Sequence, residues 1–358
     1  MSDSARPCIS GNLYINGQWT GTETSITNVS PSDTADVIGH FAQASLEHVS
    51  DAIAAANHAV GDWGRSPMET RYSVLMAIGN ELIERSRELG ELLAREEGKT
   101  HAEGIGEVYR SGQFFHYFAG EVHRQIDDRT DSVRPGIEVD TRREPVGVVA
   151  VISPWNFPMA TAVWKIAPAL AFGNSVVFKP ANLVPASAWA LTEIISRQSA
   201  LPAGTFNLVM GSGSTVGDAI INSDKIHAVS FTGSLPVGRE VAKATAANLV
   251  KCQLEMGSKN ALIVAADADL DVAVNAAFVG AYSGTGQKCT ASSRLIVDEA
   301  IHDQFVDKLV AKLRSTTVGH ALAEGVDMGP VASRQQLDEN LAWIEDGISE
   351  GANLVFGG

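Results

Sequence analysis

From residue 146 onward the sequence alternates short apolar runs with longer stretches of mixed polarity, and this alternation constrains the fold more than any other feature. Strand-sized runs separated by helix-sized stretches are typical of β-α-β units and a parallel sheet. The runs are VGVVAVIS, SVVFK, FNLVM, HAVSF and VKCQLEM, and the stretches between them are 160–172, 186–199, 214–222 and 237–247. We predict an α/β fold with a doubly wound parallel sheet, which binds a dinucleotide or similar ligand at the carboxyl ends of its strands.

The segments on either side of this alternation also carry patterns. Apolar residues recur at three- and four-residue intervals from 46 to about 122, which predicts a helical layer. The polar stretch 123–145 contains an Arg-Pro-Gly turn signal, which predicts a hairpin or another excursion from the domain. After 258 the alternation restarts with ALIVAAD, a helix near 270–283, RLIVDE and a helix at 301–315, and the final NLVFGG resembles a strand running into a turn.

The composition excludes several classes of protein. Of 358 residues, 45% are hydrophobic and 19% are charged, as in folded proteins. The longest apolar runs are far shorter than the roughly 18 residues that a membrane helix requires. The net charge of −15 disfavours nucleic acid or an anionic membrane surface as a partner. Small-molecule chemistry is therefore favoured.

The N-terminus and the cysteines indicate a cytoplasmic location. MSDSARPCISGN has neither the apolar core nor the cleavage site of a signal peptide. Cys8, Cys252 and Cys289 are too few for a disulfide framework, so we expect reduced thiols. Cys252 lies in the strand-like VKCQLEM, where we expect a small core residue.

A cysteine and a glutamate, each beside glycines, are the strongest candidates for chemistry. Cys289 lies in GTGQKCTASSR and Glu255 in LEMGSKN. A cysteine attacks only as its thiolate, which needs an electropositive setting or a base within reach, and Glu255 is a candidate base. Gly284 and Gly286 let the backbone bend and bring amides close to a substrate carbonyl. An aldehyde is the substrate that suits such a pair.

Two strand ends carry polar side chains. Asn156 in SPWNFP follows the strand at 146–152, and its amide is a candidate donor to a developing oxyanion. The alternative is a loop amide that satisfies local backbone. Lys179 and Asn182 in KPAN are candidates for a ribose or phosphate, the alternative being a solvated lysine.

Two glycine-rich segments differ in how well they suit a phosphate. GSGSTVG at 211–217 departs from the dinucleotide fingerprint in spacing and has no acidic residue at the expected distance, so we interpret it as a turn. Gly233 and Gly238 in FTGSLPVG follow a predicted strand and open a helix near Ser234, which offers amides and a positive helix terminus to a pyrophosphate. No HExxH occurs among the nine histidines, so metal catalysis has no support.

Five motifs occur together in an order and spacing that resembles the NAD(P)-dependent aldehyde dehydrogenase superfamily, from about residue 10 to the end of the sequence. They are SPWNFP, KPA, FTGS, LEMGSK and GQKC. Within the family, KPANLVPASAWAL and GTGQKCTASSRLIVDEAIHDQF are similar to the 2-oxoglutarate semialdehyde (2,5-dioxopentanoate) dehydrogenases of bacterial sugar-acid catabolism.

The resemblance implies roles for these residues. Cys289 attacks the aldehyde, Asn156 and the Cys289 amide hold the oxyanion, and Glu255 activates water to hydrolyse the thioester, so that a carboxylic acid forms. Arg294, near the nucleophile, is expected to be structural. The expected cofactor, NADP or NAD, is assigned to Trp155, Lys179, Asn182, Gly213, Phe231, Gly233, Ser234 and Gly238.

The resemblance also implies a domain organisation. We expect a cofactor-binding domain at 1–122 and 146–257, an oligomerisation excursion at 123–145, and a catalytic domain at 258–358. The partner is a small aldehyde, and the full-length form is expected to be a homodimer or homotetramer.

Four departures from the family pattern matter. Asn182 stands where NAD-preferring members have glutamate, and the loss of that charge removes repulsion against a 2′-phosphate, so NADP is expected to be accepted as well as NAD. Ser258 replaces a glycine near the nicotinamide path, and Gly284 stands where many members have asparagine. The family pattern continues beyond Gly358 with a glutamate-phenylalanine motif and further strands, so the catalytic domain is expected to be truncated.

These observations leave three hypotheses. The first is an oxidoreductase that works through a Cys289 thiohemiacetal and thioester. The second is a catalytically inactive fragment that retains nucleotide or subunit binding through residues 1–257. The third is a thiol hydrolase in which Cys289 and Glu255 cleave activated esters.

Overall fold

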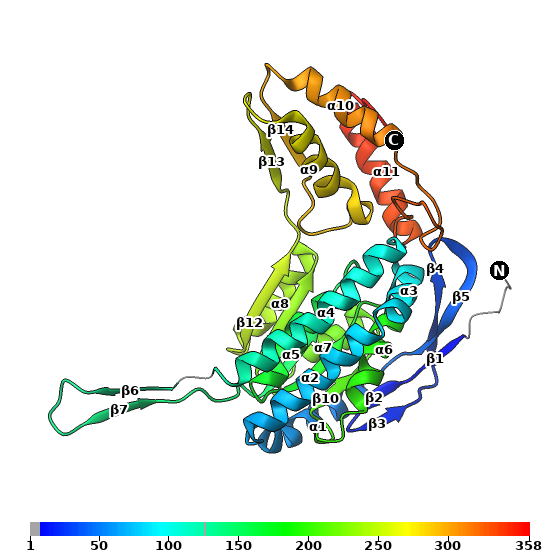
Figure 1. The fold of residues 1–358 in the computed structure, drawn as a ribbon. Helices are drawn as coiled ribbons and strands as arrows, with labels where there is room; N and C mark the ends of the chain where they lie inside the picture. The colour runs from blue at the N-terminus through cyan, green and yellow to red at the C-terminus, as the bar shows by residue number, and fades with distance from the viewer. Residues whose placement is uncertain (1–7, 125–126) are drawn as a thin grey trace.

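The computed structural model describes residues 8–124 and 127–358. The polar N-terminus at 1–7 and residues 125–126 of the predicted excursion lie outside the described residues. Figure 1 shows a large α/β body, a hairpin that extends away from it, and a smaller second lobe coloured yellow to red.

A seven-stranded sheet forms the centre of the large body. Its members are β2 (Leu13–Ile15), β3 (Gln18–Thr20), β8 (Val148–Ile152), β9 (Ser175–Lys179), β10 (Phe206–Leu208), β11 (Ala228–Gly233) and β12 (Lys251–Met256). They lie in the order β12-β11-β8-β9-β10-β2-β3. The strands from β8 to β12 are parallel, whereas β2 and β3 add antiparallel pairs at one edge. β9 is buried at every position, because helices cover both of its faces. The predicted parallel sheet is confirmed.

Helices cover both faces of this sheet. They are α1 (Leu46–Gly64), α2 (Met68–Glu84), α3 (Ser86–Glu97), α4 (His101–Val122), α5 (Ala160–Ala171), α6 (Pro185–Ser196), α7 (Asp218–Ile221) and α8 (Leu235–Ala247). α5 and α6 pack against the layer formed by α2, α3 and α4, whereas α7 contacts both α1 and α8. The predicted helical stretch from 46 to 122 is therefore divided between two sides of the sheet.

The strand order reverses direction beside β8, and this reversal positions the site. From β8 the chain proceeds outward through β9 and β10, then returns to place β11 and β12 on the other side of β8. The loops that follow β8 and β11 therefore leave adjacent strands toward opposite faces at the same carboxyl edge. Such a topological switch point leaves a crevice in which ligands bind.

Two further sheets belong to the large body. β1 (Ile9–Gly11), β5 (Asp33–Ala42) and β4 (Ser25–Ser30) form a three-stranded sheet in that order, which the sequence patterns did not predict. The predicted excursion contains the exposed antiparallel hairpin of β6 (Asp128–Asp131) and β7 (Glu138–Thr141).

The second lobe has its own small hydrophobic core. Parallel strands β13 (Ala261–Val264) and β14 (Arg294–Val297) lie with α9 (Leu270–Tyr282) and α10 (His302–Arg314), and α11 (Arg334–Ser349) follows. The buried core residues are Val264, Val274, Ala277, Phe305 and Leu309. This separate core supports a domain boundary near 258, which stays a prediction. Among the described residues, no helix is long and apolar enough to cross a membrane.

Two expectations about this part of the chain are wrong. Cys252 is exposed rather than buried, because β12 is an edge strand of the sheet and its residues 251–253 all face solvent. NLVFGG forms no strand, and each residue from 353 to 358 is exposed. A strand needs a neighbour with which to pair, and the sequence run alone supplies none.

Candidate functional site

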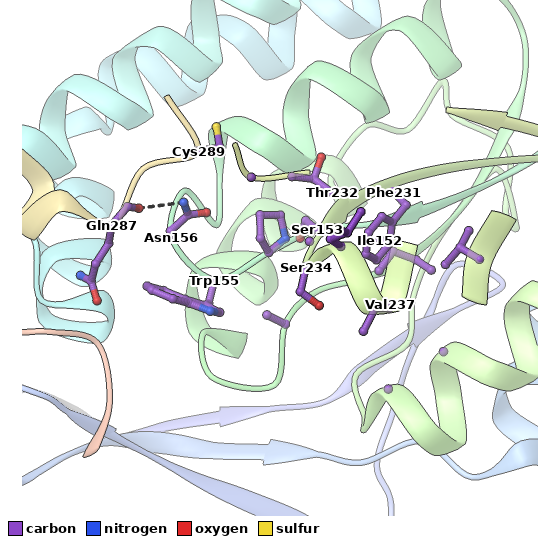
Figure 2. A pocket seen from close by; sticks show the side chains of 18 of the residues that line it. Ile152, Ser153, Trp155, Asn156, Phe231, Thr232, Ser234, Val237, Gln287 and Cys289 are labelled. Atoms are coloured by element: carbon purple, nitrogen blue, oxygen red, sulfur yellow. Dashed lines mark hydrogen bonds between the residues drawn. The ribbon is translucent and has the colours of Figure 1, made fainter. Parts of the chain in front are cut away.

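A cavity of about 1120 Å³ lies at the switch point, between the loop after β8, the loop after β11 and the segment that carries Cys289. Figure 2 shows the side chains that line it, including Trp155, Asn156 and Cys289. Most of the predicted site residues meet here: Trp155, Asn156, Lys179, Gly213, Phe231, Gly233, Ser234 and Cys289 all line the cavity. Segments far apart in the sequence therefore converge on one space.

The segment before Cys289 turns sharply. Gly284, Thr285 and Gly286 have φ angles of 61°, 56° and 68°. Glycine adopts this left-handed region without strain, whereas a β-branched threonine there is an outlier, held in place by its hydroxyl, which donates to the Gly329 carbonyl at 3.1 Å. The predicted bend before the thiol is present.

Cys289 itself is exposed in the wall of the cavity. Its carbonyl accepts a hydrogen bond of 2.9 Å from the Asn260 side chain, which joins the nucleophile segment to the start of the second lobe. Within the described residues its own N–H has no hydrogen-bond partner. That amide is available to a ligand in the cavity.

Asn156 lies in the loop after β8 and reaches the nucleophile segment. Its Nδ2 donates to the Gln287 carbonyl at 2.8 Å, as Figure 2 shows. Its backbone carbonyl accepts from Lys99 Nζ at 2.7 Å. Because an amide nitrogen carries two hydrogens, one Nδ2 hydrogen remains for a ligand.

Glu255 is placed differently from the other candidates. It lies on β12, is exposed, and accepts a 3.0 Å hydrogen bond from Gln253 Nε2. The described residues that line the cavity include Gly257 but not Glu255. In this arrangement Glu255 is exposed outside the cavity wall, and its predicted role as a base stays a prediction.

Sequence reasoning missed Lys165, which lies behind this strand. Its Nζ donates to Ser230 Oγ at 3.1 Å and lies 3.5 Å from Gln253 Oε1. Burial lowers the pKa of Lys165 to about 8, although the charge of Glu255 opposes the shift. The available signal was a single lysine within the apolar helix ATAVWKIAPALA.

Lys179 ends β9 at the cavity wall. Its side chain is buried, and its Nζ donates to the Pro180 carbonyl at 3.1 Å. Desolvation lowers the pKa of the Lys179 ammonium to about 8. A buried cation that has no carboxylate beside it in the part of the chain that the structure describes is suited to an anionic or hydroxyl-rich ligand.

The N-terminus of α8 also faces the cavity. Ser234 is its N-cap residue, and within the described residues its side chain makes no capping hydrogen bond. Because Pro236 has no N–H, the N–H groups of Leu235 and Val237 are the first-turn donors left for a ligand. Ser153 and Thr232 also line the cavity, and within the described residues their buried hydroxyl oxygens have no hydrogen-bond partner. These donors fit a nicotinamide dinucleotide with its phosphates and ribose hydroxyls.

Two predicted cofactor residues do not line the cavity. Gly238 lies within α8, where an added Cβ would come 2.4 Å from Met256 Sδ, so this glycine permits close packing of the helix on β12. Asn182 Nδ2 donates to Gln43 Oε1 at 3.3 Å. Arg294 donates twice to the Lys259 carbonyl, at 2.9 and 2.6 Å, which is a structural contact.

Comparison with known proteins gives the family. The model of the aldehyde dehydrogenase family matches residues 19–358. The chain belongs to this family. It is accordingly an oxidoreductase that oxidises an aldehyde with NAD(P). Within the described residues, no group of three or more His, Cys, Asp or Glu side chains is placed to hold a metal ion.

The individual relatives agree with this assignment. The chain is 42% identical over 349 residues to the alpha-ketoglutaric semialdehyde dehydrogenase of Bacillus subtilis, covering 96% of this chain and 71% of that enzyme. It is 38% identical to the 2,5-dioxopentanoate dehydrogenase of Saccharolobus solfataricus, covering 94% and 71%. A crystal structure of betaine aldehyde dehydrogenase from Staphylococcus aureus with NAD+ has a TM-score of 0.95 and 34% identity, covering 97% and 69%. These findings do not favour the hypothesis of an inactive binding fragment.

Proposed function

We propose that this dehydrogenase oxidises a semialdehyde, with 2,5-dioxopentanoate as the first candidate, through a covalent intermediate on Cys289. Two of the relatives, at 42% and 38% identity, are named for this compound or its synonym, alpha-ketoglutaric semialdehyde. The observation that carries the proposal is the meeting of Asn156 and Cys289 in one cavity wall, joined through Gln287.

The first step is attack of the Cys289 thiolate on the aldehyde carbon. The C–S bond forms as the carbonyl π electrons move to the oxygen, which gives a thiohemiacetal oxyanion. The free N–H of Cys289 and the remaining hydrogen of Asn156 Nδ2 are the two donors proposed for that oxygen. Preorganised donors of this kind act most strongly where charge develops.

A bound nicotinamide would supply the oxidant, as the acceptor of a hydride from the thiohemiacetal carbon. Lys179 and the amides at the N-terminus of α8 are the groups proposed to hold its ribose and phosphates. The buried hydroxyls of Ser153 and Thr232 are further donors in the same wall. Loss of hydride from the thiohemiacetal leaves a thioester on Cys289.

Glu255 is proposed to complete the cycle. A water molecule, deprotonated by the carboxylate, attacks the thioester carbon, the C–S bond breaks, and the acid and the Cys289 thiolate are released. Because Glu255 is bound to Gln253 and lies outside the cavity wall, its side chain must leave that hydrogen bond to act. Ser258, three residues further along the chain, lines the cavity.

Three further parts belong to the proposal. NADP is the preferred cofactor, because the neutral Asn182 does not repel a 2′-phosphate. The exposed hairpin β6–β7 serves in a homodimer or homotetramer. The cytoplasmic location rests on three cysteines without disulfide partners.

The test is a pre-steady-state measurement of reduced nicotinamide with 2,5-dioxopentanoate and NADP or NAD, using betaine aldehyde and phenylacetaldehyde as matched alternatives. A burst followed by turnover, with the highest kcat/KM for 2,5-dioxopentanoate, is expected. Preference for another aldehyde would reject the substrate. Absence of a burst with every aldehyde, from a protein that binds cofactor, would reject the Cys289 mechanism for this chain.

A further inference from the structure

The corner between α3 and α4 contains three charged side chains that contact the walls of the cavity without lining it. Lys99 and Glu107 are almost fully buried, with side-chain exposures of 4% and 2%. Glu103 and Glu107 lie one helical turn apart on α4 and therefore share a face. Each of the three side chains donates to or accepts from the backbone of a loop that carries a proposed catalytic group.

Lys99 and Glu107 hold the loop that carries Asn156. Lys99 Nζ donates to Glu107 Oε2 at 2.7 Å and to the Asn156 carbonyl at 2.7 Å. Glu107 Oε1 accepts from the amides of Met159 and Ala160, each at 3.0 Å. The loop is thus fixed at Asn156 and again at its exit into α5.

Glu103 holds the segment that carries Cys289. Its Oε1 accepts from the Gly284 amide at 2.7 Å. Its Oε2 accepts from the backbone and the hydroxyl of Thr100, at 3.0 and 2.9 Å, in the capping box of α4. The capping box fixes the carboxylate, so Gly284 is bound to a rigid acceptor.

We propose that Lys99, Glu103 and Glu107 are positioning residues that set the separation between the Asn156 amide and the Cys289 amide. The two donors come from different lobes, and both of their loops are bound by carboxylates that lie one turn apart on α4. A buried ion pair contributes little net stability compared with apolar residues of the same volume. The hydrogen bonds from the Lys99–Glu107 pair to the loop backbone explain why an ion pair is present at this position. The inference rests on the proposed function, in which these two donors bind one oxyanion.

The first arm of the test needs no substrate. Hydrogen exchange is measured on the whole chain. The exchange rates of the Met159 and Ala160 amides report on their hydrogen bonds to Glu107, and the rate of the Gly284 amide reports on its hydrogen bond to Glu103. Lys99→Met should speed exchange at Met159 and Ala160 by roughly tenfold or more, because the carboxylate that accepts from them loses its cation. Unchanged exchange there would overturn the inference.

Arg95→Met is the matched control, because Arg95 is equally buried on α3 and donates to Asp36 at 2.6 Å without reaching a site loop. It should lower the melting temperature while leaving exchange at Met159 and Ala160 unchanged. Glu103→Ala is the second variant, on a half-buried residue, and should speed exchange at Gly284. It keeps the inference testable if Lys99→Met does not fold.

The second arm is a double-mutant cycle on the burst rate with Asn156→Ala. If Lys99 acts through Asn156, Lys99→Met should slow the burst about tenfold in the wild-type background and less than twofold when Asn156 is already alanine. Additive effects would show a structural role only and would overturn the inference. A wild-type chain without a burst would instead count against the proposed function, and the exchange arm would still decide whether these residues hold the loops.

Discussion

The Asn156 side chain donates to the Gln287 carbonyl at 2.8 Å, which links the loop after β8 directly to the segment that carries Cys289. The two proposed oxyanion donors are therefore neighbours in one hydrogen-bonded unit, although they lie in different lobes. Gln287 is itself held, since its Oε1 accepts from the Ala332 amide at 3.0 Å. The geometry of the site depends on contacts between the lobes as much as on either lobe alone.

Asn156→Ala should slow formation of the thiohemiacetal. Loss of one oxyanion donor typically costs about 10²–10³ in rate, so the burst rate constant should fall by that amount while the Kd for NADP changes less than about twofold. Stopped-flow absorbance and cofactor titration measure the two quantities. A burst unchanged by the substitution would assign Asn156 to loop structure alone, which is the alternative that the sequence left open.

Cys289→Ala should abolish dehydrogenase and esterase activity together, because both need the same thiolate. Cys252→Ala is the matched control, since Cys252 is also exposed and unpaired but lies on the edge strand β12. It should retain wild-type activity and remain sensitive to iodoacetamide at Cys289. Dehydrogenase turnover retained by Cys289→Ala would reject the nucleophile.

Glu255→Gln should spare the burst and stall turnover, because a glutamine cannot deprotonate the water that hydrolyses the thioester. Quenched-flow mass spectrometry should then find the acyl group on Cys289. The hydrogen bond from Gln253 holds the carboxylate away from the cavity in the resting arrangement, so Gln253→Ala should leave deacylation intact. Loss of the burst in Glu255→Gln would extend the role of this residue beyond deacylation.

The sequence predicted the sheet of the large body because hydrophobic runs and turn residues are local signals. β9 coincides with the predicted SVVFK, β8 and β12 fall within the predicted runs, and β11 overlaps HAVSF but continues two residues further, to Gly233. The same patterns could not show which strand lies at an edge, since strand order is a property of the whole sheet. Cys252 was therefore predicted to be buried and is exposed.

The sequence predicted the site residues that a local motif places at a strand end or a helix start. It did not predict those whose role depends on packing between distant segments. Asn156, Lys179, Ser234 and Cys289 follow strand ends or a helix start, and the cavity brings them together. Gly238 belongs to the same motif as Gly233 but serves the packing of α8 against Met256. Lys99 and Glu107 gave no local signal, because their partners lie about fifty residues away.

Asn182→Glu should shift the cofactor preference from NADP toward NAD. A carboxylate near the 2′-phosphate adds repulsion between two anions, which should weaken NADP binding roughly tenfold and leave NAD binding within about twofold. Isothermal titration with both cofactors measures the change. Asn182→Gln keeps the amide and should behave as wild type, and equal losses for both cofactors would show only that the contact with Gln43 was disturbed.

NADP affinity should fall as the pH rises above about 8, because burial lowers the pKa of Lys179 to about 8. The 2′-phosphate is mostly dianionic above its second pKa of about 6, so the protonation of the lysine dominates the change. A lysine whose pKa is lower in the folded state binds fewer protons when folded than when unfolded. The contribution of Lys179 to folding stability therefore increases as the pH rises from 8. Unfolding caused by Lys179 cannot explain the expected loss of NADP affinity.

Kd for NADP should therefore be nearly constant between about pH 7 and pH 8 and increase above pH 8, by up to about tenfold per unit, and Lys179→Met should remove this increase. Lys165→Met is the matched control, since burial also lowers the pKa of Lys165 to about 8 but its contacts are Ser230 and Gln253. It should keep the wild-type pH profile. If Kd does not change with pH in the wild type, or if the pH dependence persists in Lys179→Met, the phosphate is bound by the amides at the N-terminus of α8 and not by Lys179.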